Sequence, residues 1–189
     1  MSKQFKNFMS KALWLLVILF GIRCFISWGE ITANPSVYSI VSFAGEAIGV
    51  TVFIMLLYEK WLWRTRVFQK MEDTPCLYSE YSGVIKSEYD GIEREVNLKI
   101  KQSLLSVHIT MTSGESGSKS ISSSIDTILG EKQLTYCYLN TPKTEYRHKS
   151  EIHYGTAMLN VENVELLTGQ YFTDRNTRGD MMLHAKKPS

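Results

Sequence analysis

The sequence predicts a membrane hairpin of two helices followed by an all-β domain, a minimal lipocalin-like barrel of eight antiparallel strands. Two observations lead to this prediction. Residues 12–28 and 37–58 are apolar stretches, each close to the roughly 20 residues that a helix needs to cross a bilayer. After Pro75 apolar and polar residues alternate, which is typical of half-buried strands. We therefore expect a membrane hairpin at residues 1–70 and a separate barrel domain at residues 75–189.

Basic residues flank the two apolar stretches, whereas the connection between them, which contains Asn34-Pro35, carries only Glu30 as a charged residue. By the positive-inside rule this pattern places both termini in the cytoplasm. An uncleaved hairpin is favoured over a signal peptide because bulky residues end the first stretch and a second stretch follows at once. The flanking residues are Lys3, Lys6, Lys11, Lys60, Arg64, Arg66 and Lys70.

Each apolar stretch contains one residue that is costly in lipid, Arg23 in the first and Glu46 in the second. Either the two pair inside the membrane, or Arg23 reaches the outer headgroups and Glu46 is protonated. Gly45 and Gly49 form a G-x-x-x-G, which lets helices approach closely, within one hairpin or between chains. These four residues are the candidates for membrane assembly.

The second domain is predicted to contain eight short strands and no long helix. Asp90-Gly91 is a strong hairpin signal, and residues 113–120 are expected to form a Gly/Ser-rich loop. A barrel closes such strands without leaving an exposed edge, and a two-sheet sandwich is the alternative. The expected strands are residues 77–89, 92–101, 105–111, 121–129, 133–140, 151–161, 164–173 and 178–185.

Motifs of enzyme chemistry are nearly absent, since the chain has no P-loop and no G-x-S-x-G. We therefore predict that it is not an enzyme. His148, Glu151 and His153 would alternate across a strand rather than surround a metal, so no metal site is expected. The formal net charge of +2 argues against DNA or RNA as a partner. Cys137 has no activating neighbour in sequence and is expected in the core.

The turn at residues 173–178 carries two arginines, two threonines and an asparagine. Guanidinium forks and hydroxyls are the donors that a phosphate needs. The alternative is that Arg175 and Arg178 pair with Asp174 and Asp180 to hold the hairpin together. From the residues alone both interpretations stay open.

Two strand faces carry side chains that suit a nucleobase, because residues two apart point to the same side of a strand. Aromatic rings can stack on a base, and an amide can read its edge by hydrogen bonds. The alternative is that the tyrosines belong to the core. The two faces are Tyr171, Thr173 and Arg175 on one strand and Tyr136, Tyr138 and Asn140 on another.

Three motifs, together with the order of hairpin and strands, carry a resemblance to a known family. They are LTYCYLNTP at 134–142, HYGTAML at 153–159 and TGQYFTDRNTRG at 168–179. Over almost its whole length the chain resembles the two-transmembrane, β-barrel effectors of bacterial cyclic-oligonucleotide anti-phage signalling, the CBASS systems.

The resemblance implies a barrel that binds a cyclic dinucleotide made by a partner nucleotidyltransferase, with no cofactor. It further implies a multi-pass protein of the bacterial inner membrane that contacts lipid, forms homo-oligomers when activated and disrupts the membrane, so that infection is abortive. The residues it assigns to the ligand are Tyr171, Thr173, Arg175, Thr177 and Arg178, with Tyr138 and Asn140 as base contacts and Tyr78 and Tyr81 as further candidates for the pocket wall.

Two other functions remain open on the sequence. A membrane-tethered, lipocalin-like carrier or sensor of a lipid or another small apolar ligand predicts an apolar cavity without converging arginines. A hydrolase would use His148, Glu151 or His153.

Overall fold

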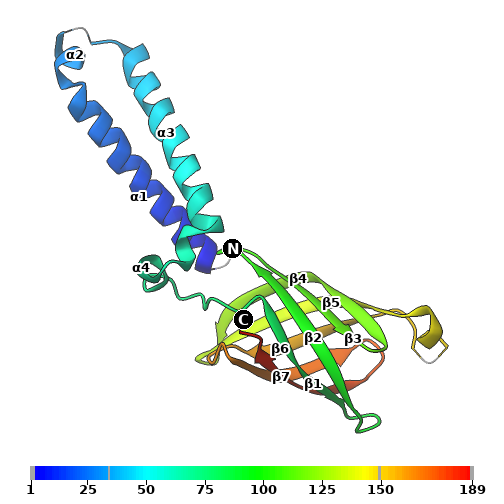
Figure 1. The fold of residues 1–189 in the computed structure, drawn as a ribbon. Helices are drawn as coiled ribbons and strands as arrows, with labels where there is room; N and C mark the ends of the chain where they lie inside the picture. Colours follow the sequence, from blue (N-terminus) through cyan, green and yellow to red (C-terminus); the bar gives the residue numbers. More distant parts are fainter. Residues whose placement is uncertain (1–2, 34, 149, 188–189) are drawn as a thin grey trace. The chain divides into compact units, whose positions relative to one another are not determined.

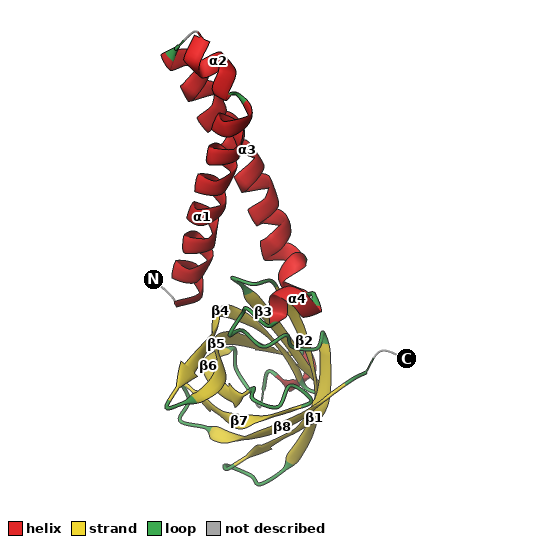
Figure 2. Ribbon diagram, turned by 90° about the vertical axis from the view of Figure 1, so that its left-hand side faces the viewer, coloured by secondary structure: helices red, strands yellow, loops and turns green. Residues whose placement is uncertain are grey.

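A computed structural model describes residues 3–33, 35–148 and 150–187 and divides the chain into two compact units, Met1–Met71 and Glu72–Ser189 (Figure 1). Asn34, part of the predicted connection between the two spans, lies outside the described residues. The first unit is helical and the second is built from strands (Figure 2).

The first unit is a hairpin of two long helices, α1 (Lys3–Ile26) and α3 (Val37–Lys60), joined through α2 (Trp28–Ala33). Each long helix has 24 residues and is about 36 Å long at 1.5 Å per residue, enough to cross a hydrocarbon core of about 30 Å. Both are also apolar enough to span a membrane. The short helices η1 (Leu62–Arg64) and α4 (Arg66–Gln69) follow α3.

The G-x-x-x-G motif lies away from the contact between α1 and α3. A methyl group added at Gly45 or Gly49 would meet no atom of the described residues within 4 Å. Helix α3 is instead buried along a stripe of residues spaced mostly four apart, which is the spacing of one helix face. The motif therefore does not build the hairpin, contrary to one of the two interpretations of the sequence. The buried stripe is Phe43, Ala47, Thr51, Met55 and Tyr58.

Arg23 and Glu46 pair within the hairpin, since Arg23 Nε donates to Glu46 Oε2 over 2.7 Å. Arg23 also donates to the hydroxyl of Ser27. Its guanidinium carbon lies 4.1 Å from the centroid of the Phe43 ring, which is a cation–π distance. The two charges in the middle of the apolar stretches, Arg23 and Glu46, therefore pair with each other.

The second unit is a closed barrel of eight antiparallel strands in which each strand pairs with the next and β8 pairs with β1. Figure 2 shows these strands as a closed ring. The predicted barrel is confirmed, and the sandwich is excluded. The strands are β1 (Glu80–Ser87), β2 (Glu93–Gln102), β3 (Val107–Ser113), β4 (Ser116–Ile128), β5 (Glu131–Pro142), β6 (His153–Asn160), β7 (Leu166–Thr173) and β8 (Arg178–Ala185), with the short helix η2 (Thr144–Tyr146) after β5.

The predicted loop at residues 113–120 is wrong, because β4 already begins at Ser116. Glycine is depleted in strands and serine is common in turns, but here the backbone pairs with β3 on one side and β5 on the other. Those ladder bonds decide the conformation. The predicted Asp90-Gly91 turn is confirmed, and Gly91 has the positive φ of 65° that favours glycine.

Cys137 is exposed, whereas the sequence predicted it in the core. On β5 the buried residues are Leu134, Tyr136, Tyr138 and Asn140, so the strand alternates and the odd-numbered side chain points outward. The Cys137 sulfur lies 3.4 Å from the hydroxyl of Thr156, its cross-strand partner.

The inside of the barrel changes character from one end to the other. At one end Leu134, Leu159 and Leu167 have no exposed surface and form part of one continuous apolar cluster. Towards the other end of the same strands the inward residues become polar, and Asn140 pairs in register with His153. One end is therefore filled by the core, and the other end has side chains that can hold a polar ligand.

Candidate functional site

A cavity of about 690 Å³ occupies the polar end of the barrel. Its volume lies within the range of about 300–1,000 Å³ that is common for small-molecule sites. The structure brings six of the predicted ligand residues together in its wall: Tyr138, Asn140, Tyr171, Thr173, Arg175 and Thr177.

Two tyrosines two residues apart on β5 form an aromatic wall. The ring centroids of Tyr136 and Tyr138 lie 5.8 Å apart with an interplanar angle of 45°. Gly155 is the cross-strand partner of Tyr138, and a methyl group at Gly155 would lie 2.4 Å from that ring. Glycine at this position therefore leaves the space that the Tyr138 ring occupies.

The hydroxyl of Tyr136 is an unsatisfied polar group in this wall. The residue is only 1% exposed, and within the described ranges the hydroxyl has no hydrogen-bond partner. Burial raises the pKa of Tyr136 and of Tyr138, so both hydroxyls are neutral donors. A buried hydroxyl without a partner costs about 1–3 kcal/mol. Such a group beside a cavity marks a place where a ligand can supply the missing bond.

Asn140 is the second such group. Its side chain is buried, with 8% of the residue exposed, and its carboxamide makes no side-chain hydrogen bond to any residue in the described part of the chain. An amide offers both a donor and an acceptor. Among the residues described, the deeper wall therefore holds an unpartnered hydroxyl and an unpartnered amide next to the cavity.

The turn between β7 and β8 presents Arg175 at the cavity. The hydroxyls of Thr173 and Thr177 hydrogen-bond to each other over 2.6 Å, and Thr173 N donates to Thr177 O over 2.9 Å. The two threonines thus fasten the turn. The Arg175 guanidinium forms no ion pair within residues 3–33, 35–148 and 150–187, so its charge is available to an anion.

The pairing of arginines with Asp174 and Asp180, the alternative offered by the sequence, does not occur. Asp174 accepts from the backbone N–H of Tyr154 over 3.1 Å, and Asp180 accepts from Gln170 over 3.1 Å.

Arg178 lies outside the cavity. Both its Nε and its Nη2 donate to the carboxylate of Glu88, the latter over 2.9 Å. This bidentate contact lowers the pKa of Glu88. Arg178 therefore joins β8 to the end of β1 on the outer surface.

Tyr78 and Tyr81 also lie away from the cavity. Tyr81 has no exposed surface; its hydroxyl donates to Val164 O over 2.8 Å and accepts from Tyr78 N over 3.1 Å. Burial raises the pKa of Tyr81 to about 12. Tyr81 belongs to the apolar cluster, and Tyr78 packs against it.

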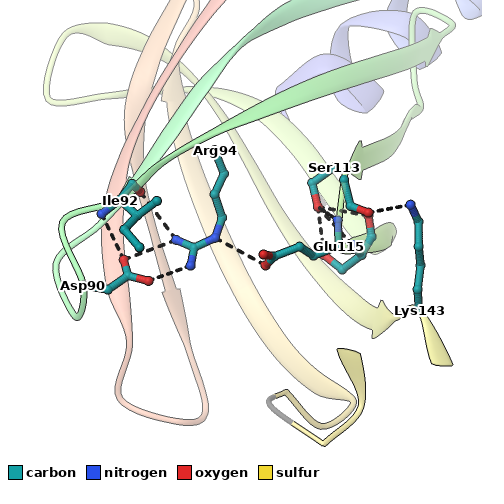
Figure 3. Close-up of polar contacts among 8 residues, drawn as sticks. Asp90, Ile92, Arg94, Ser113, Glu115 and Lys143 are labelled. Carbon is teal, nitrogen blue, oxygen red and sulfur yellow. Dashed lines mark hydrogen bonds and ion pairs between the residues drawn. The ribbon is translucent and has the colours of Figure 1, made fainter. Parts of the chain in front are cut away.

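Sequence reasoning missed Arg94, although period-two alternation along β2 gives it the same face as the buried Val96 and Leu98. Arg94 lines the cavity and contacts Asp90 and Glu115 (Figure 3). The Arg94 hydrogen bond is the main reason why the pKa of Asp90 falls to about 2. The cavity therefore holds a second arginine, and this one has partners.

His153 also lines the cavity. Its Nδ1 lies 2.9 Å from the carbonyl oxygen of Glu151, which is an acceptor, so Nδ1 is the donor in this hydrogen bond. Within the described ranges, no group of three or more histidine, cysteine, aspartate or glutamate residues is arranged to hold a metal ion.

Comparisons with known proteins agree on one family. The family model described as "Cap15, cyclic dinucleotide receptor domain" matches residues 72–185. That segment contains all eight strands and every residue of the cavity wall. CD-NTase-associated protein 15 of Staphylococcus schleiferi is 30% identical over 178 residues, which cover 92% of this chain and 93% of the relative.

Proposed function

The chain belongs to the Cap15 family of CBASS effectors, and on that premise we propose that the barrel cavity is its cyclic dinucleotide site and that binding there activates the membrane hairpin. The unpartnered hydroxyl of Tyr136 is the observation that carries the proposal. A nucleobase edge supplies the hydrogen bond that this hydroxyl lacks, whereas a lipid tail would leave it unpaired. An apolar ligand is for that reason the weaker candidate.

Each side of the cavity matches one part of a cyclic dinucleotide. The rings of Tyr138 and Tyr171 offer stacking surfaces for bases, and Asn140 reads a base edge. Arg175 holds a phosphodiester through its guanidinium. Thr173 and Thr177 act by fastening the turn that carries Arg175. We assign Arg178 to the outer wall and Tyr78 and Tyr81 to the core.

We assign no catalytic step to this chain, which acts as a receptor for a cyclic dinucleotide supplied by a partner nucleotidyltransferase. The basic flanks of the hairpin favour an orientation with both termini in the cytoplasm. The barrel then lies in the compartment where a nucleotide second messenger is made, and the hairpin lies in the inner membrane.

The proposed output is assembly of hairpins in the membrane, followed by its disruption and cell death. A ligand drives such assembly only if it binds the assembled form more tightly than the single chain. Gly45 and Gly49 form a small-residue face not used inside the hairpin, which suits close contact with another copy. Glu46 remains half-exposed beside its partner Arg23, so the ion pair can also take part in that contact.

Calorimetry on the full-length protein in nanodiscs tests the receptor step. The ligands are cyclic di-GMP, cyclic di-AMP, cyclic GMP–AMP and cyclic UMP–AMP, each compared with the linear dinucleotide of the same bases. Arg175→Ala removes charged hydrogen bonds of about 1.5–3 kcal/mol, so affinity should fall about 10- to 100-fold. Arg178→Ala, the matched control outside the cavity, should change affinity less than about 3-fold. Absence of binding to all four cyclic ligands, or equal losses in the two variants, refutes the proposal.

A further inference from the structure

Arg94 is held at the cavity by carboxylates from two different turns (Figure 3). Its Nη2 and Nη1 donate to the two carboxylate oxygens of Asp90 over 2.6 and 3.2 Å. Its Nε donates to Glu115 Oε2 over 3.4 Å. Asp90 lies between β1 and β2, and Glu115 lies between β3 and β4. One guanidinium therefore links two hairpin turns that both line the cavity.

The two carboxylates are not equivalent partners. Asp90 binds Arg94 through both oxygens and also accepts from the backbone N–H of Ile92 over 3.1 Å, so it belongs to a closed local network. Glu115 makes one long contact, and half of its side chain is exposed (52%). Exposed ion pairs of this kind contribute little to stability. Of the two contacts, the one between Arg94 and Glu115 is therefore the one that a bound anion can replace.

The backbone that carries Glu115 is fixed from both sides. Ser113 Oγ accepts from the N–H of Glu115 over 3.2 Å and from that of Ser116 over 3.0 Å. On the other side Lys143 N donates to Glu115 O over 2.9 Å, and Lys143 Nζ donates to the carbonyl of Gly114. Glu115 can therefore leave Arg94 by rotating its side chain alone, while the turn stays in place.

The charges around the cavity balance when no ligand is bound. Arg94 and Arg175 supply two positive charges, and Asp90 and Glu115 supply two negative ones. A cyclic dinucleotide carries two phosphodiesters, each with one negative charge. Among the described residues no carboxylate pairs with Arg175. A phosphodiester that approaches Arg94, in contrast, meets Glu115 on the same guanidinium edge, and like charges at contact distance repel.

We propose that Arg94 is the second phosphate anchor of the cavity and that Glu115 competes with the ligand for it. A phosphodiester takes the place of Glu115 on the Nε edge of Arg94, while Asp90 keeps the guanidinium aimed at the cavity. A phosphodiester matches this fork better than a single carboxylate oxygen at 3.4 Å does. Glu115 thereby sets the selectivity: a nucleotide with one phosphate binds at Arg175 alone, and a ligand with two phosphates also displaces Glu115.

This inference rests on the proposed function and is tested by calorimetry on the full-length protein in nanodiscs, with the member of the four-ligand panel that the wild type binds. Glu115→Gln removes the competing charge, so affinity should rise about 3- to 10-fold. The matched control is Glu95→Gln, the same charge change on an exposed residue next to Arg94 in β2. Its affinity should stay within about 2-fold of the wild type.

A double-mutant cycle separates competition from a general charge effect. In an Arg94→Ala background, whose fold is checked by circular dichroism, affinity should be about 10-fold lower than in the wild type. There Glu115→Gln should no longer raise affinity, because no guanidinium is left to release. If Glu115→Gln leaves affinity unchanged in the wild type, or raises it equally without Arg94, the inference fails while the proposed function stands. If the wild type binds none of the four ligands, both fail.

Discussion

Replacing Tyr136 with phenylalanine is expected to stabilise the free barrel and to weaken ligand binding. The Tyr136 hydroxyl is buried without a partner, so the free protein loses no hydrogen bond when it is removed. An unpaired buried hydroxyl costs about 1–3 kcal/mol. If about 1 kcal/mol is recovered, the melting temperature should rise by roughly 4 °C in a domain of this size.

The same substitution at Tyr81 is the matched control and should have the opposite effect on stability. The Tyr81 hydroxyl donates to Val164 O and accepts from Tyr78 N, so Tyr81→Phe leaves two buried backbone groups without their partner. The expected loss is about 1–2 kcal/mol, a fall of roughly 4–8 °C.

Thermal unfolding of residues 72–189 measures both changes, because the apolar cluster of the barrel draws only on residues between 77 and 185. Calorimetry then compares affinities. Tyr136→Phe should weaken cyclic dinucleotide binding by about 2- to 10-fold, the value of one neutral hydrogen bond, and Tyr81→Phe should not change it. A Tyr136→Phe barrel that is as destabilised as Tyr81→Phe would refute the reasoning, since the hydroxyl would then have a partner in the free protein.

Three further predictions concern other parts of the chain. Gly155→Ala places a methyl group where the Tyr138 ring lies, so calorimetry should show about 10-fold weaker binding and unfolding should show a loss of about 1–3 kcal/mol; unchanged affinity would contradict this. Gly49→Leu should abolish ligand-dependent dye release from vesicles that contain the full-length protein and leave ligand affinity unchanged. If dye release persists, the hairpin only anchors the barrel to the membrane. Arg94 holds the pKa of Asp90 at about 2, so the ion pair should persist until the pH falls through that value. An NMR titration of Asp90 with a midpoint near the ordinary carboxyl value would contradict this, and so would a midpoint that stays at about 2 in Arg94→Ala.

The sequence was sufficient to predict most of the barrel, because alternation along a strand follows directly from which face is buried. The sequence pattern wrongly predicted a loop at residues 116–120. These serine and glycine residues form part of β4, because their backbone is hydrogen-bonded to β3 and β5. The prediction that Cys137 lies in the core was also wrong, because the side chain at this position of β5 points outward.

The candidate site was predictable to the extent that period two groups residues on one face. Period two cannot be carried across the turn between β7 and β8, because the pairing register of the two strands is not known from the sequence. Arg178 pairs with the exposed Phe172, whereas the next residue, Gly179, pairs with Tyr171 of the cavity wall. Cross-strand partners share a face, so Arg178 points outward.

The position of an inward residue along the barrel axis was the second feature that the sequence could not predict. Tyr81 faces inward, but its partner in β2 is Leu98, at the filled end. Sequence alternation separates inside from outside and gives no position along the barrel axis. Three-dimensional register was needed to separate the core tyrosines from those of the cavity.

A crystal structure of residues 72–189 with the cyclic dinucleotide that binds the protein tests the central claim most directly. We expect the ligand inside the barrel, with a base against the ring of Tyr138, a hydrogen bond to the hydroxyl of Tyr136 and a phosphodiester on Arg175. Ligand bound on the outer surface, for example at Arg178 and Glu88, with the cavity empty, would contradict the account.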